Sequence, residues 1–274
     1  MSKRLLFYKV MEYPIPQPEE YFYYTKKVNI KEKKTDCLQG STSPLTKEYV
    51  NHIKKYTRLF KSIPRIQEIY LCNSISFNAT HPKSDIDVFI VAKSWYMRRA
   101  RFWSVFLFFL FGQKRSRNCF IKKFCLSFFV TDDHKNIFPL AEKEDVYLIY
   151  WLAHLIPLYL ETKSLQNSIY KENTWIQKFL PNHPGTHCIN IDIPITTGKS
   201  LFKKLIEKLT NWHIGKRIQK VIKRSRLPIM LYKKHKLWNK WKQIVISDKV
   251  CRFYADKRLV YNTLFKKHAK KSQR

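Results

Sequence analysis

The order of helical and strand-like segments in the first half of this 274-residue chain constrains its fold more than its composition does. Ser43 and Pro44 form a pair typical of a helix start, and apolar side chains then recur at helical spacing up to Pro64. Two strand-like runs, a second helical segment and at least one more strand-like run follow, at residues 66–74, 84–93, 94–112 and 118–133. This order predicts an α+β core with a small sheet and flanking helices.

The regions on either side of this core differ from it. Pro14, Pro16 and Pro18 block a regular helix near the start of the chain, so we expect a partly extended segment there. Beyond residue 137, helical spacing returns and predicts helices over residues 142–161, 167–181 and 198–225. The sequence therefore predicts an N-terminal extension (1–44), a core (45–137) and a mainly helical, strongly basic C-terminal region (138–274).

The charge of the chain is large and unevenly placed. The formal net charge is +33, and residues 201–274 contain 23 Lys and Arg but 3 acids, a net charge of +20. Trp212, Trp238 and Trp241 lie among these basic residues, a mixture that suits RNA or single-stranded nucleic acid. Amphipathic helices with buried aromatic side chains and a solvated basic face fit the same pattern. Nucleic acid, RNA in particular, is an expected partner of residues 201–274, with the solvated face as the alternative.

Two apolar runs, residues 102–112 and 146–160, are shorter than the roughly 20 residues that a membrane-spanning helix needs. We expect two buried core helices and no integral membrane segment. The six cysteines show no CxxC pair, which favours a reducing cytoplasm, and Cys72 and Cys125 are expected to be buried thiols. A rival interpretation places residues 102–112 and the basic tail on an anionic membrane surface.

Two acids, Asp85 and Asp87, begin the second strand-like run. Alternate side chains of a strand share a face, so these carboxylates point the same way while Ile86, Val88 and Ile90 point into the core. Parallel carboxylates repel each other unless a cation lies between them, and Mg²⁺ is a hard ion that takes carboxylate and phosphate oxygens. The alternative is a polar strand end in which one acid caps a turn.

The turn before this strand contains Asn73 and Ser74, whose backbone N–H groups and hydroxyl suit an anion. Ser74 followed by Asp85-x-Asp87 resembles the polymerase-beta-type nucleotidyltransferase superfamily, and an uncharacterised bacterial group of minimal nucleotidyltransferase-like proteins within it. The resemblance implies a small mixed sheet with flanking helices, followed by a helical region. It implies Mg²⁺ and catalysis at Asp85 and Asp87, and nucleoside triphosphate binding at Asn73, Ser74 and Ser84.

The chain departs from this superfamily at two points. Asn73 replaces the usual Gly, although Asn tolerates a positive φ better than most residues do. The superfamily also implies a third carboxylate on the next strand, here residues 124–130, whose best polar side chain in mid-strand is Ser127. Asp132 and Asp133 follow that strand, and a bulge is needed to bring either inward. We therefore expect metal and nucleotide binding with slow or absent turnover, the alternative being a catalytically weak or inactive nucleic-acid-binding module on the same fold.

Overall fold

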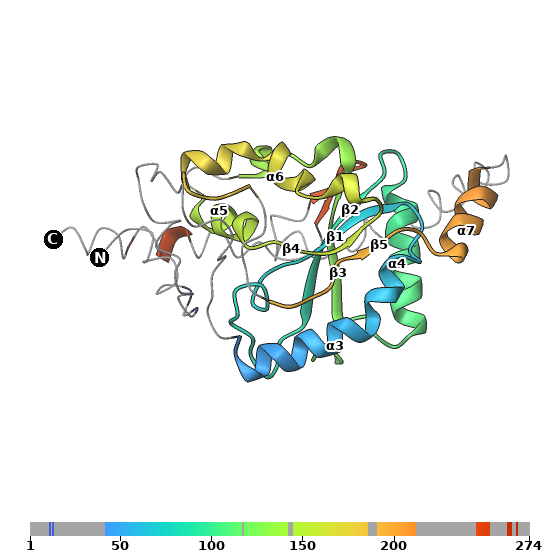
Figure 1. Cartoon of the computed structure of the whole chain (residues 1–274), viewed down its shortest axis with the longest axis horizontal. Helices are drawn as coiled ribbons and strands as arrows, with labels where there is room; N and C mark the ends of the chain where they lie inside the picture. Colours follow the sequence, from blue (N-terminus) through green and yellow to red (C-terminus); the bar gives the residue numbers. More distant parts are fainter. Residues whose placement is uncertain are drawn as a thin grey trace.

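The computed structural model describes residues 42–116, 118–141, 145–185, 191–211, 245–252 and 262–264, with Met11, Tyr13 and Lys267. Its helices are α3 (Pro44–Phe60), α4 (Met97–Leu110), α5 (Val146–Ala153), α6 (Ser168–Glu172) and α7 (Leu201–Asn211) (Figure 1). Its strands are β1 (Ile66–Leu71), β2 (Ile86–Ala92), β3 (Phe124–Thr131), β4 (Ile156–Leu160), β5 (Thr196–Thr197), β6 (Val245–Ile246) and β7 (Val250–Arg252). Most of the expected N-terminal extension and of the basic tail lies outside the described residues.

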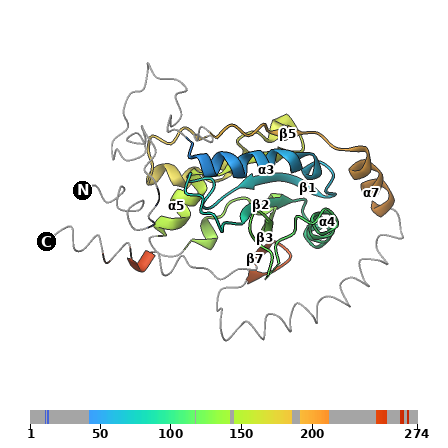
Figure 2. The same ribbon diagram turned by 90° about the horizontal axis from the view of Figure 1, so that it is seen from below.

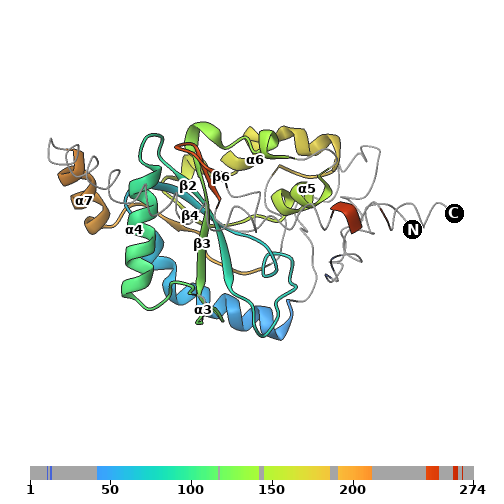
Figure 3. The same ribbon diagram turned by 180° about the vertical axis from the view of Figure 1, so that it is seen from behind.

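The strands form a seven-stranded mixed sheet in the order β5-β4-β1-β2-β3-β7-β6. At its centre β1 pairs with β2 in antiparallel fashion, and β2 pairs with β3 in parallel. Strands β4 and β7 extend this unit with antiparallel pairs to β1 and β3. Figure 3 shows the sheet from behind, with α4 beside β3. The expected combination of a mixed sheet with flanking helices is confirmed at this level.

Both faces of the central strands are buried. One apolar cluster joins the sheet to α3 and α4, and a second joins it to α5 and α6. Figure 2 shows α3 lying along the sheet beside β1. Within β2, Ile86, Val88 and Ile90 belong to the first cluster as expected, whereas Phe89 and Val91 belong to the second. A strand that is buried on both faces reads as a continuous apolar run, which is what the sequence shows here.

The start of α3 follows the sequence prediction. The Ser43 hydroxyl accepts a hydrogen bond from the Thr46 N–H at 3.1 Å, and Pro44 is the first helical residue. This cap needs residues that are close in sequence, so local chemistry is enough to predict it.

The helix expected over residues 142–161 is wrong in its second half. Helix α5 ends at Ala153, and residues 156–160 form β4 in the sheet between β5 and β1. Every residue of β4 is buried. Pro157 pairs with Tyr70 next to a register shift between β4 and β1, and because the regular backbone hydrogen bonds are interrupted there, the missing N–H of proline is tolerated. Strands β4, β5 and β7 lie beyond residue 137 and join the same sheet as β1–β3. The sheet therefore continues across the predicted core boundary at residue 137.

Helix α4 begins and packs differently from the prediction. Its N-cap is Tyr96 without a side-chain hydrogen bond, and Ser94, the first residue of the helical segment expected over 94–112, lies outside the helix and donates its hydroxyl to Asp132. The helix ends before Gly112, which has a φ of 62°. A fully buried α4 is wrong as well: Ala100 and Phe108 are buried, but much of the C-terminal half is exposed. No helix among the described residues is both long and apolar enough to cross a membrane.

Candidate metal and nucleotide site

The turn after β1 brings the first predicted site residue into position. Asn73 has a φ of 62°, in the left-handed region that Asn tolerates. Its carbonyl accepts hydrogen bonds from the Ser76 hydroxyl at 2.8 Å and from the Phe77 N–H at 3.2 Å. The Ser74 carbonyl accepts one from the Ala79 N–H at 2.8 Å, which closes the turn. The turn therefore forms with Asn73, rather than a Gly, at its position of positive φ.

The Asn73 side chain connects this turn to the strand acids. Its amide nitrogen donates to Asp87 Oδ2 at 2.7 Å. Its amide oxygen accepts from Trp151 Nε1 at 2.9 Å and from the Tyr147 hydroxyl at 3.3 Å, both on α5. A Gly in this position offers none of these contacts, so Asn73 has a structural role: it fixes the carboxylate of Asp87 against α5.

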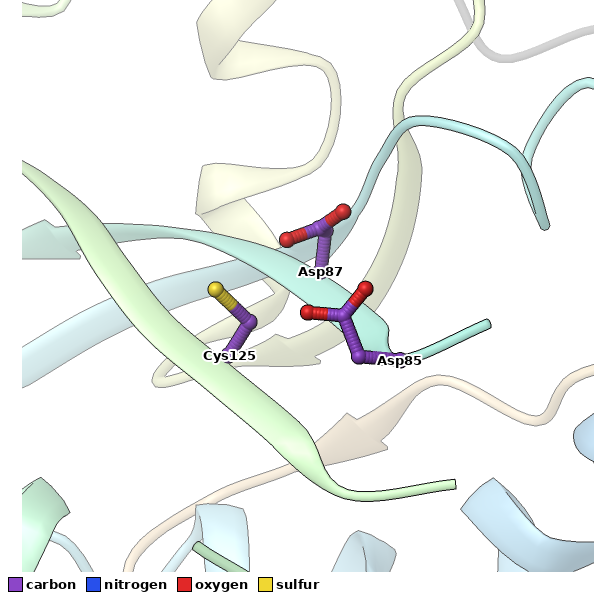
Figure 4. A group of neighbouring side chains, drawn as sticks. All are labelled: Asp85, Asp87 and Cys125. Carbon is purple, nitrogen blue, oxygen red and sulfur yellow. The ribbon is translucent and has the colours of Figure 1, made fainter. Parts of the chain in front are cut away.

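Three side chains from two neighbouring strands form the candidate site. One ligand atom each from Asp85, Asp87 and Cys125 lie within 4.8 Å of one another. Figure 4 shows the two carboxylates on one side of β2 and the thiol approaching them from β3. Cys125 pairs with Asp87 in the parallel β2–β3 ladder, so backbone register sets this neighbourhood. Two carboxylates and a thiol are a donor set that can hold a divalent metal ion.

A bulge in β3 changes which of its side chains share a face, relative to the simple alternation expected from the sequence. Asp87 pairs with Cys125 and Phe89 pairs with Phe128, so one residue of β2, Val88, lies opposite two of β3, Leu126 and Ser127. Leu126 consequently joins the core cluster under α3, while Phe128 joins the opposite one. Ser127, expected to be the polar residue facing the acids, lies 3.0 Å from Cys125 through its hydroxyl. Cys125, read from the sequence as a buried thiol alone, completes the cluster.

The two acids after β3 lie far from this cluster. Asp132 follows Thr131, which pairs with Ala92 at the opposite end of β2 from Asp87. Six residues of β3 separate these ends, roughly 20 Å at strand rise. Asp132 accepts a hydrogen bond from the Ser94 N–H at 2.8 Å, and Asp133 pairs with His134 at 3.0 Å. Neither carboxylate reaches the site, so the bulge does not supply a third acid.

Burial and like charge dominate the electrostatics of the cluster. Burial, and then the charge of Asp87, raise the pKa of Asp85 to about 6, against the opposing effect of Arg115. Arg115 Nη1 lies 2.8 Å from Asp85 Oδ2, a charge contact without hydrogen-bond alignment, and 3.3 Å from Cys125 Sγ. Burial also raises the pKa of the Cys125 thiol far above its ordinary value, so this thiol is protonated at neutral pH in the metal-free protein.

The two predicted serines lie in the segment that connects β1 to β2. The Ser84 hydroxyl accepts from the His81 N–H at 2.9 Å, and the Ser84 carbonyl accepts from the Tyr49 hydroxyl at 3.0 Å. Ser84 thus closes the turn that leads into β2, directly before Asp85. Ser74 is partly exposed next to Asn73. The structure brings Asn73, Asp85 and Asp87 to one end of β2 and adds Cys125 and Arg115, which lie 38 and 28 positions after Asp87 in the sequence.

Comparison of this chain with protein-family models, with curated proteins and with solved structures finds no match.

Proposed function

We propose that this chain binds a nucleoside triphosphate with a divalent cation at Asp85 and Asp87, and slowly transfers a nucleoside monophosphate to an acceptor hydroxyl. The observation that carries the proposal is the convergence of Asp85, Asp87 and Cys125 ligand atoms within 4.8 Å beside the Asn73–Ser74 turn. The order of α3, β1, turn, β2, α4 and β3 supports it, since the resemblance to nucleotidyltransferases implies a carboxylate pair on a strand that follows such a turn.

The residues of the site suggest how the reaction proceeds. Asp85 and Asp87 would hold the cation, which would supply positive charge against the triphosphate and so favour attack by the acceptor hydroxyl. The hydroxyl oxygen bonds to the α-phosphorus, the bond to the β-phosphate oxygen breaks, pyrophosphate leaves, and the hydroxyl proton passes to water. Arg115, already beside Asp85, adds positive charge next to the phosphates. The carboxylate pair favours Mg²⁺, a hard ion, while the Cys125 sulfur is a soft donor and a poor ligand for it.

The thiol at position 125 accounts for the slow turnover in this proposal. A protonated, buried thiol neither accepts the proton of an attacking hydroxyl nor adds negative charge for a second metal ion. Binding requires Asp85 and Asp87, whereas fast chemistry requires a further base. The second candidate function, a weakly active or inactive nucleic-acid-binding module, is favoured by the same observation.

Removal of the carboxylate charges is expected to abolish most of the metal-nucleotide binding. In titration calorimetry, Asp85→Asn/Asp87→Asn should weaken Mg-ATP binding by about a hundredfold or more, since loss of even an outer-shell partner costs about 10–100-fold in metal affinity. Asp192→Asn is the matched control, because this exposed acid pairs with Lys54 and is outside the cluster. Equal Mg-ATP affinity in the double variant and the control contradicts the assignment.

The expectation of an RNA partner rests on the sequence of residues 201–274, and the salt dependence of RNA binding tests it. Binding of the full chain to poly(U) should weaken about 10³-fold or more between about 50 and 200 mM salt if six or more phosphates are neutralised. Filter binding measures this slope. A flat salt dependence, or no binding at low salt, indicates a solvated basic surface instead.

A further inference from the structure

Helix α7 has its apolar and polar faces reversed relative to an ordinary surface helix. Leu201, Leu205 and Leu209 are 51–82% exposed, whereas Lys203 is fully buried and Glu207 is buried with it. A surface helix of a globular protein normally turns its apolar stripe toward the core. Exposure of this leucine stripe therefore needs an explanation.

Polar contacts fix the orientation of α7. Lys203 Nζ donates to the Tyr159 hydroxyl at 2.9 Å and forms an ion pair with Glu161 at 3.0 Å. Glu207 accepts from the Arg65 backbone N–H at 2.8 Å and pairs with Lys199 at 3.1 Å. Rotation of the helix to bury its leucines breaks all four contacts and leaves charged groups unpaired inside the protein. The exposed stripe is thus part of the native arrangement.

Helix α4 extends the apolar surface. Phe106, Phe109, Leu110 and Phe111 at its C-terminal end are 43–71% exposed. The two helices meet where the Trp103 and Phe202 rings lie 5.9 Å apart, and Figure 1 shows them as neighbours at one end of the molecule. We call this surface the α4–α7 face, comprising Phe106, Phe109, Leu110, Phe111, Leu201, Phe202, Leu205 and Leu209. Such a group of large exposed apolar side chains marks an interaction surface.

The charges on the α4–α7 face are basic. Lys204 and Lys208 are exposed on α7, and each lies three residues after an exposed leucine, Leu201 or Leu205, on the same side of the helix. Helix α4 contains no acid, and the acid of α7, Glu207, is buried. A face that combines apolar side chains with lysines and has no exposed acid is complementary to a surface with an anionic outer layer and an apolar layer beneath it.

We infer that the α4–α7 face binds the surface of an anionic lipid bilayer, with both helices lying in the plane of the interface. Leucine and phenylalanine side chains enter the acyl boundary while Lys204 and Lys208 reach back to the lipid phosphates. In a protein–protein interface the same lysines are desolvated among leucines, which disfavours that partner. Nucleic acid is tested as the alternative occupant, because the four phenylalanines of the face could stack on bases whereas its four leucines could not.

Vesicle flotation of the full chain tests this inference. The probes are phosphatidylcholine vesicles and vesicles in which roughly a third of that lipid is phosphatidylglycerol. The wild type should float with the anionic vesicles, and Phe109→Ser/Leu205→Ser should bind them at least about tenfold more weakly, because two apolar side chains no longer enter the bilayer. Serine leaves the net charge unchanged, so the loss reports the apolar contacts alone.

The matched control is Phe138→Ser/Phe179→Ser, at two phenylalanines that are 54% and 43% exposed and that both pack on Trp175. It should float like the wild type. Equal flotation of the Phe109→Ser/Leu205→Ser variant and the control overturns the inference. It is also overturned if the wild type stays unbound to anionic vesicles while the same substitutions abolish a dimer in sedimentation velocity or the binding of poly(U).

Discussion

Cys125→Asp is expected to raise nucleotidyl transfer by about 10²-fold or more, the contribution typical of a well-placed general base. Cys125 pairs with Asp87 on the neighbouring parallel strand, and its sulfur belongs to the 4.8 Å cluster. A carboxylate in this position accepts the proton of the acceptor hydroxyl and gives the metal an oxygen ligand in place of a soft sulfur. Transfer of a labelled nucleotide to product, followed over hours with Mg²⁺, measures the gain.

Cys125→Asn is the matched control for this substitution, since it has nearly the same shape as Asp without the charge. It should bind Mg-ATP and show transfer no faster than the wild type. The prediction fails if the Asp and Asn variants transfer equally well, or if the Asp variant binds Mg-ATP normally and gains no activity. Three neighbouring carboxylates also repel one another, so the Asp variant should gain more thermal stability from Mg²⁺ than the wild type does.

The residue to replace by Asp is Cys125 rather than Ser127, and this difference shows which features of the chain its sequence alone can predict. The helix start at Ser43 and the shared face of Asp85 and Asp87 depend on neighbours in sequence and on the two-residue period of a strand. The bulge in β3 depends on how β3 packs between two apolar clusters, so an apolar run with one cysteine and one serine contains no local signal for it. Cys125 is the second residue of β3, as Asp87 is of β2.

Strand β4 was missed for a related reason. Residues 146–160 are apolar throughout, and a strand buried on both faces has no alternation to separate it from a buried helix. His154 and Pro157 mark the change from α5 to β4, but each is also tolerated near a helix end. The reversed α7 is a similar case, because its helical periodicity predicts a helix without saying which stripe the tertiary contacts of Lys203 and Glu207 will bury.

Asp85→Asn is expected to stabilise the metal-free protein while removing its stabilisation by metal. The folded-state pKa of Asp85 is about 6, above its unfolded value near 4, so the folded protein holds this proton more tightly. The wild type therefore loses stability as pH rises from about 4 to about 6, and the loss stays constant above that range. The Asp85→Asn variant, whose amide is neutral at every pH, does not lose stability in this way. At pH 8 the free energy of unfolding of the variant should be about 2–3 kcal/mol higher than that of the wild type, and at pH 4 the two values should differ little.

Divalent metal should reverse this order, because it binds the folded wild type through the charges that repel each other without it. At a hundred times its dissociation constant a metal ion adds about 2.7 kcal/mol to the stability of the wild type, and it should add far less to Asp85→Asn. Urea denaturation at pH 4 and pH 8, with and without Mg²⁺ or Mn²⁺, measures both effects, and Asp192→Asn should follow the wild type throughout. A variant that is less stable than the wild type at pH 8 without metal contradicts the proposed repulsion. Equal stabilisation of both proteins by metal contradicts the proposed site, because in that proposal the cation is held through both carboxylates.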